Sequence, residues 1–113
     1  MASSLPARTA YVSLSGELDA FTEWKLNEAL PDPAEVDNVI INLVRVTHLD
    51  STALGQLVRF RHHFLEAGGQ RENLVVILPR SGAARTVFEI AGLSQLFAIA
   101  EASGDSSAPP IST

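Results

Sequence analysis

Two short apolar runs on either side of an amphipathic segment limit most strongly how this chain can fold. Residues 39–43 and residues 74–78 each suit a β-strand, whereas apolar side chains between them recur at helical spacing from Ser51 to about Ala67. Two strands joined by such a helix are normally parallel, because the crossover returns the chain to the same end of the sheet. Residues 39–43 are apolar at consecutive positions except Asn42, so we expect an interior strand covered on both faces.

The segment before this strand predicts a further strand and a helix. Residues 11–15 alternate in polarity as a half-buried strand does. Asp19 can cap a helix that runs to about Leu30, where two nearby prolines stop it. The residues expected on the inward side of this helix are Phe21, Leu26, Ala29 and Leu30.

Glycines mark the ends of the next two helices. Residues 68–69, both glycine, predict the end of the long helix. A shorter helix is expected to begin at Ser81 or Gly82 and to end at Gly92, with residues 96–100 as the last strand. The residues expected on its inward side are Ala84, Val87, Phe88 and Ala91.

These elements predict a small single-domain α/β fold, with a central mixed, mostly parallel sheet of four to five strands and helices packed on it. The pattern leaves an antiparallel first strand open. With 113 residues and 46% hydrophobic content the chain suits one domain, which we place at residues 1–101. Residues 102–113 form a Ser/Pro-rich tail that lacks enough apolar surface to fold, so we expect it to be disordered.

Composition argues against several classes of function. The chain has 8 Lys and Arg residues against 13 Asp and Glu residues, and its net charge of -5 repels the phosphates of a nucleic acid. Cysteine is absent, which excludes disulfides, thiolate catalysis and cysteine-ligated metal sites. No apolar run approaches the roughly 18 residues of a membrane span, and residues 1–9 lack the apolar core of a signal peptide. We therefore expect a cytoplasmic protein without direct membrane insertion.

Residues 17–37 carry most of the negative charge. Lys25 is the single basic residue among their acidic side chains. Such a segment suits either a solvated face or a docking surface for a basic partner. Its acidic residues are Glu17, Asp19, Glu23, Glu28, Asp32, Glu35 and Asp37.

Residues 48–55, His-Leu-Asp-Ser-Thr-Ala-Leu-Gly, place an acid and two hydroxyls where a strand meets the long helix. Ser51 falls in the first helical turn, where its oxygen can cap a backbone N–H and an attached phosphate meets the positive end of the helix dipole. Asp50 is expected to cap the helix or to order the loop. No Gly-rich turn followed by a Lys-Ser/Thr pair is present, so the sequence supports neither ATP binding nor a cofactor.

Two minor hypotheses use the histidines. His62 and Glu66 are i,i+4 neighbours that can share one face of the long helix, yet no third metal ligand is evident. A hydrolase built on Ser51, with His48 as its base, lacks a Gly-x-Ser-x-Gly elbow. We therefore assign no catalytic residue and no metal ligand.

The long helix also carries two side chains of ambiguous placement. Arg61 lies within the apolar stripe, where its stem can pack while its guanidinium reaches water or a carboxylate. Phe60 lies at the flank of that stripe. Together with Gln56 and Arg59 it can form an exposed docking surface.

Four blocks stand in a characteristic order along most of the chain. They are residues 14–19 (Leu-Ser-Gly-Glu-Leu-Asp), 40–43 (Ile-Ile-Asn-Leu), 49–55 (Leu-Asp-Ser-Thr-Ala-Leu-Gly) and 88–93 (Phe-Glu-Ile-Ala-Gly-Leu), followed by Phe97. Each block is short, but their order and separation together resemble the STAS domain family. Within that family they resemble the bacterial anti-sigma factor antagonists.

The resemblance implies a regulatory switch rather than an enzyme. In such proteins the unphosphorylated antagonist binds an anti-sigma factor that is also a serine kinase, which releases the sigma factor. Phosphorylation of the serine after the aspartate abolishes binding, and a phosphoserine phosphatase restores it. The matching serine here is Ser51, with Thr52 as the less favoured acceptor. The residues expected at the switch and partner-binding surface are Asp19, Asp50, Thr52, Ala53 and Gln56.

Two features depart from the family pattern. Ala53 stands where a glycine commonly occurs, so we expect an added methyl at the contact surface and a first turn favoured by roughly 1 kcal/mol. The amphipathic C-terminal helix common in the family has no counterpart in the Ser/Pro-rich tail. A STAS scaffold, or an accessory subunit of a transporter, that acts without phosphorylation is the alternative function.

Overall fold

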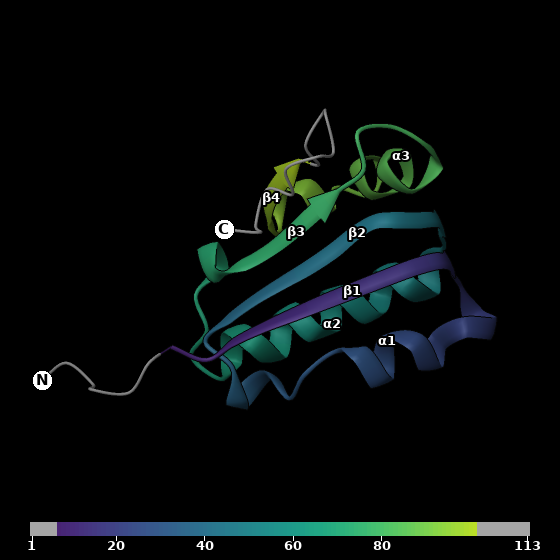
Figure 1. The fold of residues 1–113 in the computed structure, drawn as a ribbon. Coiled ribbons are helices and arrows are strands. Elements are labelled where there is room, and N and C mark those ends of the chain that lie inside the picture. Colours follow the sequence, from purple (N-terminus) through teal and green to yellow (C-terminus); the bar gives the residue numbers. More distant parts are fainter. Residues whose placement is uncertain (1–6, 102–113) are drawn as a thin grey trace, which may run out of the picture.

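The structure, a computed structural model, describes residues 7–101. Its strands are β1 (Thr9–Leu18), β2 (Asn38–Leu49), β3 (Leu74–Leu78) and β4 (Ala98–Glu101). Its α-helices are α1 (Glu23–Ala29), α2 (Ser51–Glu66) and α3 (Ala83–Ile90). Strands and helices alternate along the chain as predicted (Figure 1), and the expected tail at residues 102–113 lies outside the described residues.

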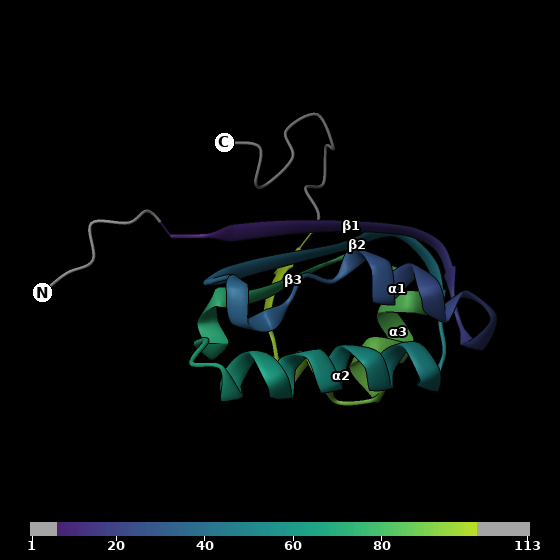
Figure 2. The same ribbon diagram turned by 90° about the horizontal axis from the view of Figure 1, so that it is seen from below.

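All strands of the described sheet are parallel. Their order is β1-β2-β3-β4, so each helix connects two neighbouring strands. Right-handed crossovers between successive neighbours place every helix on the same face of a sheet. Figure 2 shows α1, α2 and α3 together on one side of this sheet. The predicted α/β fold is confirmed, and its first described strand is parallel to β2 rather than antiparallel.

β2 lies in the interior of the sheet, as predicted, but the helices cover only one of its faces. Val39, Ile41 and Leu43 are fully buried. Ile40 and Asn42 point to the opposite face and are half-buried. The prediction that both faces are covered is therefore wrong for the described residues. The run looked continuous because β-branched residues are favourable on either face of a strand.

The core lies between the sheet and the helices. α2 contributes Leu57 and Phe64, which are fully buried, and Phe60, whose ring stacks on that of Phe64 at a centroid distance of 6.2 Å. α3 contributes Phe88, whose ring centroid lies 6.0 Å from that of Phe97. The expected docking role of Phe60 is wrong, because its side chain is only 6% exposed.

The entry to α1 also differs from the prediction. Asp19 caps a short 3₁₀ turn (Ala20–Thr22), and α1 starts only at Glu23. A 3₁₀ turn has about 3.0 residues per turn instead of about 3.6, which changes the direction in which each side chain points. Phe21 is consequently 91% exposed while Leu26 is buried. The prediction that Phe21 faces the core is wrong.

Left-handed glycines end the two later helices as predicted. Gly68 has a φ of 101° after α2, and Gly92 has a φ of 81° after α3. A 3₁₀ turn (Leu93–Gln95) follows Gly92, so that β4 begins later than expected and Leu96 lies outside it. Ala91 is the C-cap of α3 and is exposed, which corrects its expected inward position.

The Arg61 side chain, whose placement the sequence left open, bonds to a main-chain carbonyl. Its Nε donates a hydrogen bond to the carbonyl oxygen of Leu96 at 2.7 Å. Arg61 is therefore half-buried beside the turn before β4, with its Nε bonded to a main-chain carbonyl.

The end of α2 provides a test of core packing. A Cβ added at Gly69 would lie 2.5 Å from ring carbons of Phe64, whereas one added at Gly55 would lie 3.6 Å from Nη1 of Arg59. We expect Gly69→Ala to lower the free energy of unfolding by about 1–3 kcal/mol, because the buried ring must shift. Gly55→Ala, the control within α2, should be neutral or stabilise by up to about 1 kcal/mol. Urea unfolding measures both, and equal stabilities would contradict the packing described.

Candidate functional site

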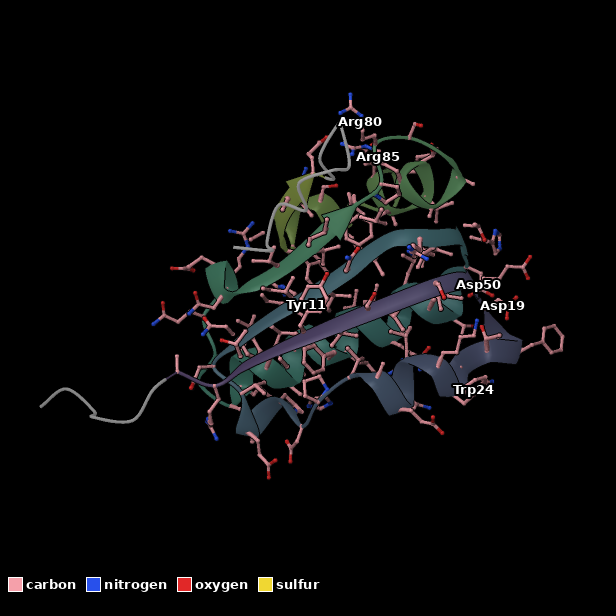
Figure 3. The ribbon with its side chains drawn as sticks, viewed as in Figure 1. Tyr11, Asp19, Trp24, Asp50, Arg80 and Arg85 are labelled. Carbon is pink, nitrogen blue, oxygen red and sulfur yellow. The ribbon has the colours of Figure 1, made fainter. Side chains whose placement is uncertain are left out.

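The carboxyl ends of β1 and β2 bring two aspartates together. Leu18 and Leu49 are register partners in the parallel pair, and each is followed directly by an aspartate. Because parallel strands end at the same edge of a sheet, Asp19 and Asp50 lie side by side there (Figure 3). This edge is the usual place for functional groups in open α/β sheets.

Asp50 connects the beginnings of two helical segments. Its Oδ1 accepts a hydrogen bond from the main-chain N–H of Ala53 at 3.1 Å, which makes it the N-cap of α2. Its Oδ2 accepts from the N–H of Ala20 at 3.2 Å, in the turn that leads to α1. Its own N–H donates to the carbonyl oxygen of Leu18 at 3.1 Å. The expected capping role of Asp50 is confirmed, and the same carboxylate also orders the neighbouring loop.

Asp19 forms a capping box with Thr22. Its Oδ1 accepts from the N–H groups of Phe21 at 2.9 Å and Thr22 at 3.1 Å. The N–H of Asp19 donates to the Thr22 hydroxyl oxygen at 2.9 Å. That hydroxyl in turn donates to the carbonyl oxygen of Glu17 at 2.9 Å. The turn before α1 is therefore fixed by its own side chains, and its Ala20 N–H connects it to Asp50.

Ser51 is the first residue of α2 and is exposed. Because Asp50 is the N-cap, the ordinary capping role considered for Ser51 does not apply. Within residues 7–101 no hydrogen bond engages the Ser51 hydroxyl, whereas Thr52 is half-buried. The Ser51 oxygen thus lies at the positive end of the α2 dipole and is accessible to a partner.

Ala53 and Gln56 lie beneath this surface rather than on it. Ala53 is 1% exposed and Gln56 is 6% exposed. The Gln56 Nε2 donates to the carbonyl oxygen of Glu23 at 3.2 Å and to Oδ1 of Asn27 at 3.1 Å, which joins α2 to α1. Their expected positions on the contact surface are therefore wrong, because the inward side of α2 packs against α1 and the sheet. The methyl of Ala53 belongs to the core.

Phe21 is the exposed side chain that the sequence pattern misassigned. It is the most exposed of the large apolar residues described, and Trp24, one helical turn later, is 56% exposed. Asp19 followed by Thr22 three residues later is a sequence signal for a helix start, and it places residue 21 in the first turn. Phe21 follows Ala20, whose N–H donates to Asp50, so an exposed apolar side chain belongs to the turn bonded to this edge.

The acidic segment is only partly neutralised. Asp37 accepts a hydrogen bond from the main-chain N–H of Arg8 at 2.8 Å, and this bond, together with the Arg8 guanidinium, lowers the pKa of the Asp37 carboxyl. The Lys25 ammonium donates to the carbonyl oxygen of Ser15 at 3.3 Å. Among the ion pairs of the described residues none includes Glu23 or Glu28. The exposed side of α1 is therefore anionic.

The geometry gives little support to the minor hypotheses. Nε2 of His62 lies 3.2 Å from a Glu66 carboxylate oxygen, with both side chains mostly exposed. In the part of the chain that the structure describes, no three His, Cys, Asp or Glu side chains are grouped to hold a metal ion. His48 is exposed near the end of β2, and no hydrogen bond of the described residues connects it with Ser51. No described helix is long and apolar enough to cross a membrane.

Comparison with known proteins identifies the family. The model of the STAS domain matches residues 6–106. The chain belongs to the STAS domain family. An anti-sigma-B factor antagonist of Listeria monocytogenes is 31% identical over 96 residues, which cover 83% of this chain and 81% of that protein. An anti-sigma-B factor antagonist of Staphylococcus aureus is 36% identical over 93 residues, which cover 80% of this chain and 82% of the relative.

A solved structure confirms the fold of this STAS domain. The anti-sigma factor antagonist SpoIIAA in its unphosphorylated form superposes with a TM-score of 0.64. The alignment covers 91% of this chain and 87% of that chain at 22% sequence identity. The family resemblance carried by the four sequence blocks is confirmed by the match to the STAS family model.

The double hydrogen bond of Asp50 provides a test of the site. Asp50→Ala should lower the free energy of unfolding by about 1–2 kcal/mol, because the Ala53 and Ala20 N–H groups both lose their acceptor. Asp50→Asn keeps one acceptor oxygen and should give an intermediate value. Urea unfolding combined with hydrogen exchange at these two amides measures the effect. Faster exchange at only one amide in Asp50→Ala would refute the bridge.

Proposed function

We propose that this STAS protein is an anti-sigma factor antagonist that binds an anti-sigma factor serine kinase and is switched off by phosphorylation of Ser51. The observation that carries the proposal is the exposed Ser51 hydroxyl at the first position of α2, directly after a carboxylate that already caps the helix. The named function of the relatives in Listeria and Staphylococcus supports the same class of activity.

A phosphate on Ser51 is compatible with the fold. Phosphoserine carries about −1.5 to −2 charges, and a helix N-terminus favours negative charge. The Ser51 side chain points to solvent, so the modification need not disturb the buried Ala53 behind it. Phosphorylation therefore changes the surface that a partner meets rather than the stability of the domain.

The effect on binding follows from the charge already present. The phosphate joins the carboxylates of Asp19 and Asp50 at the same edge of the sheet (Figure 3). A partner that accommodates those two acids meets a much stronger negative field, and like-charge contacts cost several kcal/mol. Removal of the phosphate by a phosphoserine phosphatase restores the original surface. Binding is thus controlled by one reversible charge.

Each residue of the surface has a separate role in this proposal. Ser51 accepts the phosphate, and Thr52 is the less accessible hydroxyl. Asp19 and Asp50 hold the two helix starts in position through their caps. Phe21 provides apolar contact area beside them. Ala53 and Gln56 support the surface from below, so alanine in place of the usual glycine leaves the contact area itself unchanged.

Phosphate mapping tests the switch. The full chain is incubated with candidate anti-sigma factor kinases and ATP, and the products are analysed by mass spectrometry. We expect one phosphate on Ser51, its loss in Ser51→Ala and its retention in Thr52→Ala. Ser51→Asp should bind the kinase at least about tenfold more weakly, a change of about 1.4 kcal/mol, with no loss of stability against urea.

Two outcomes contradict this switch. A wild-type protein that binds the kinase but gains no phosphate would support a scaffold or a transporter subunit that acts without phosphorylation. A Ser51→Asp variant that binds as tightly as wild type would refute the electrostatic explanation.

Phe21 provides an independent test of the docking surface. Phe21→Ala should weaken kinase binding by about 2 kcal/mol, roughly thirtyfold, because an exposed aromatic at the centre of an interface is a typical hot spot. Its stability should hardly change, since the ring is 91% exposed. Ile90→Ala is the matched control, because Ile90 is 81% exposed on α3. Calorimetric titration measures both, and an equal loss in the two variants would exclude a specific role for Phe21.

A further inference from the structure

α1 is too short to be a stable helix by itself. It spans seven residues, whereas isolated helices shorter than about 12–15 residues are marginal in water. Leu26 is its single buried residue. Figure 2 shows α1 on the same face of the sheet as α2. Contacts with the rest of the domain therefore set the position of α1, and the apolar contact of one leucine has no preferred direction.

A directional contact comes from Gln56 of α2. Its Nε2 donates to the carbonyl oxygen of Glu23 at 3.2 Å and to Oδ1 of Asn27 at 3.1 Å. These two acceptors are i,i+4 neighbours, so one amide group bonds to successive turns of α1. Lys25 connects α1 to the carbonyl oxygen of Ser15 at 3.3 Å, but through a long and flexible side chain. Because hydrogen bonds weaken steeply with angle, the Gln56 amide fixes the rotation of α1 and its position along α2.

The same amide carries a buried oxygen without a donor. Gln56 is 6% exposed, and no group of residues 7–101 donates a hydrogen bond to its Oε1. The amide cannot be turned over, because the carbonyl oxygen of Glu23 only accepts and requires the NH₂ group. An unsatisfied buried acceptor costs about as much as two ordinary hydrogen bonds contribute. The bonds to α1 therefore add little net stability, and an apolar side chain of the same shape would be about as favourable.

We infer that Gln56 is a positioning residue, which holds α1 in the place that a kinase bound at Ser51 requires. The inference rests on the proposed function. Ser51 begins α2 and Gln56 lies five residues later in the same helix, so the phosphoacceptor and the amide belong to one rigid element. The amide thus determines where α1 lies relative to Ser51, and it does so without a large gain in stability.

α1 carries the part of the surface that this position affects. Trp24 on α1 is 56% exposed, and Phe21 in the turn before it is 91% exposed. Figure 3 shows Trp24 on α1 at the same end of the molecule as Asp19 and Asp50. A rotation of α1 moves the Trp24 ring relative to Ser51 even when the fold stays intact. Loss of the amide therefore weakens the binding of a partner that contacts both helices.

Replacement of Gln56 by methionine tests the positioning role. Methionine has nearly the same size and shape and no hydrogen-bond donor. Gln56→Met should leave the urea midpoint of unfolding unchanged or raise it, because the unsatisfied Oε1 is removed together with the two bonds. Hydrogen exchange at the amides of α1 should become faster, and the fluorescence anisotropy of Trp24, the one tryptophan of the chain, should fall. A clear loss of stability, or unchanged exchange in α1, would overturn the inference.

Kinetics of phosphate transfer measure the consequence for the switch. We expect Gln56→Met to raise the KM for transfer to Ser51 at least about tenfold with little change in kcat, because the position of α1 affects binding and leaves Ser51 in place. An unchanged KM in a variant whose α1 exchanges faster would also overturn the inference. A wild-type chain that accepts no phosphate contradicts the proposed function instead, and the exchange comparison then decides the role of Gln56 by itself.

Two further variants separate position from stability. Leu57→Met changes the neighbouring buried residue of α2, which is apolar and donates no hydrogen bond to α1, so it should lower the urea midpoint slightly and leave KM unchanged. Asn27→Ala removes one of the two acceptors and should raise KM less than Gln56→Met does. Alanine favours a helix over asparagine, so faster exchange of α1 in Asn27→Ala cannot arise from helix propensity. An equal rise of KM in Leu57→Met and Gln56→Met would assign the effect to core packing and contradict the positioning role.

Discussion

The carboxylate of Asp50 accepts hydrogen bonds from Ala53 and from Ala20, and these two bonds hold the start of α2 against the turn that leads to α1. The strand pair β1–β2 brings the two chain segments together, because Leu18 and Leu49 end in register. The bridge adds a side-chain connection between the start of α2 and the turn that carries Phe21. The surface proposed to bind a kinase thus depends on the register of the β1–β2 pair and on the Asp50 carboxylate that bonds to both helix starts.

Helices pack on only one face of the sheet, and this explains why its two faces differ in how far they are covered. Consecutive parallel strands place all helices on one face, so the core is formed there and the opposite face stays open. The same order leaves β1 at a border, with its outer backbone groups unpaired by any described strand. The proposed switch surface at the strand ends and the open face of the sheet are therefore separate consequences of one topology.

Periodicity predicted the elements well because each element depends on local patterns. The bounds of β3 match the expected strand, and α2 begins at Ser51 and ends before the two glycines as expected. The family blocks likewise indicated the STAS fold, which the comparisons confirm. Predictions of which side chains are exposed were weaker. Phe21 was expected inside and lies outside, while Phe60 was expected at the surface and lies in the core.

The sequence by itself determined the order of strands and helices, the capping role of Asp50 and the position of Ser51 in the first turn of α2, because neighbouring residues decide all of these. Only the tertiary structure decided which side of each element is covered. Ala53 and Gln56 are buried because α1 packs on α2, and Phe21 is exposed because a 3₁₀ turn precedes α1. Burial depends on contacts between distant segments, and helical spacing alone does not encode them.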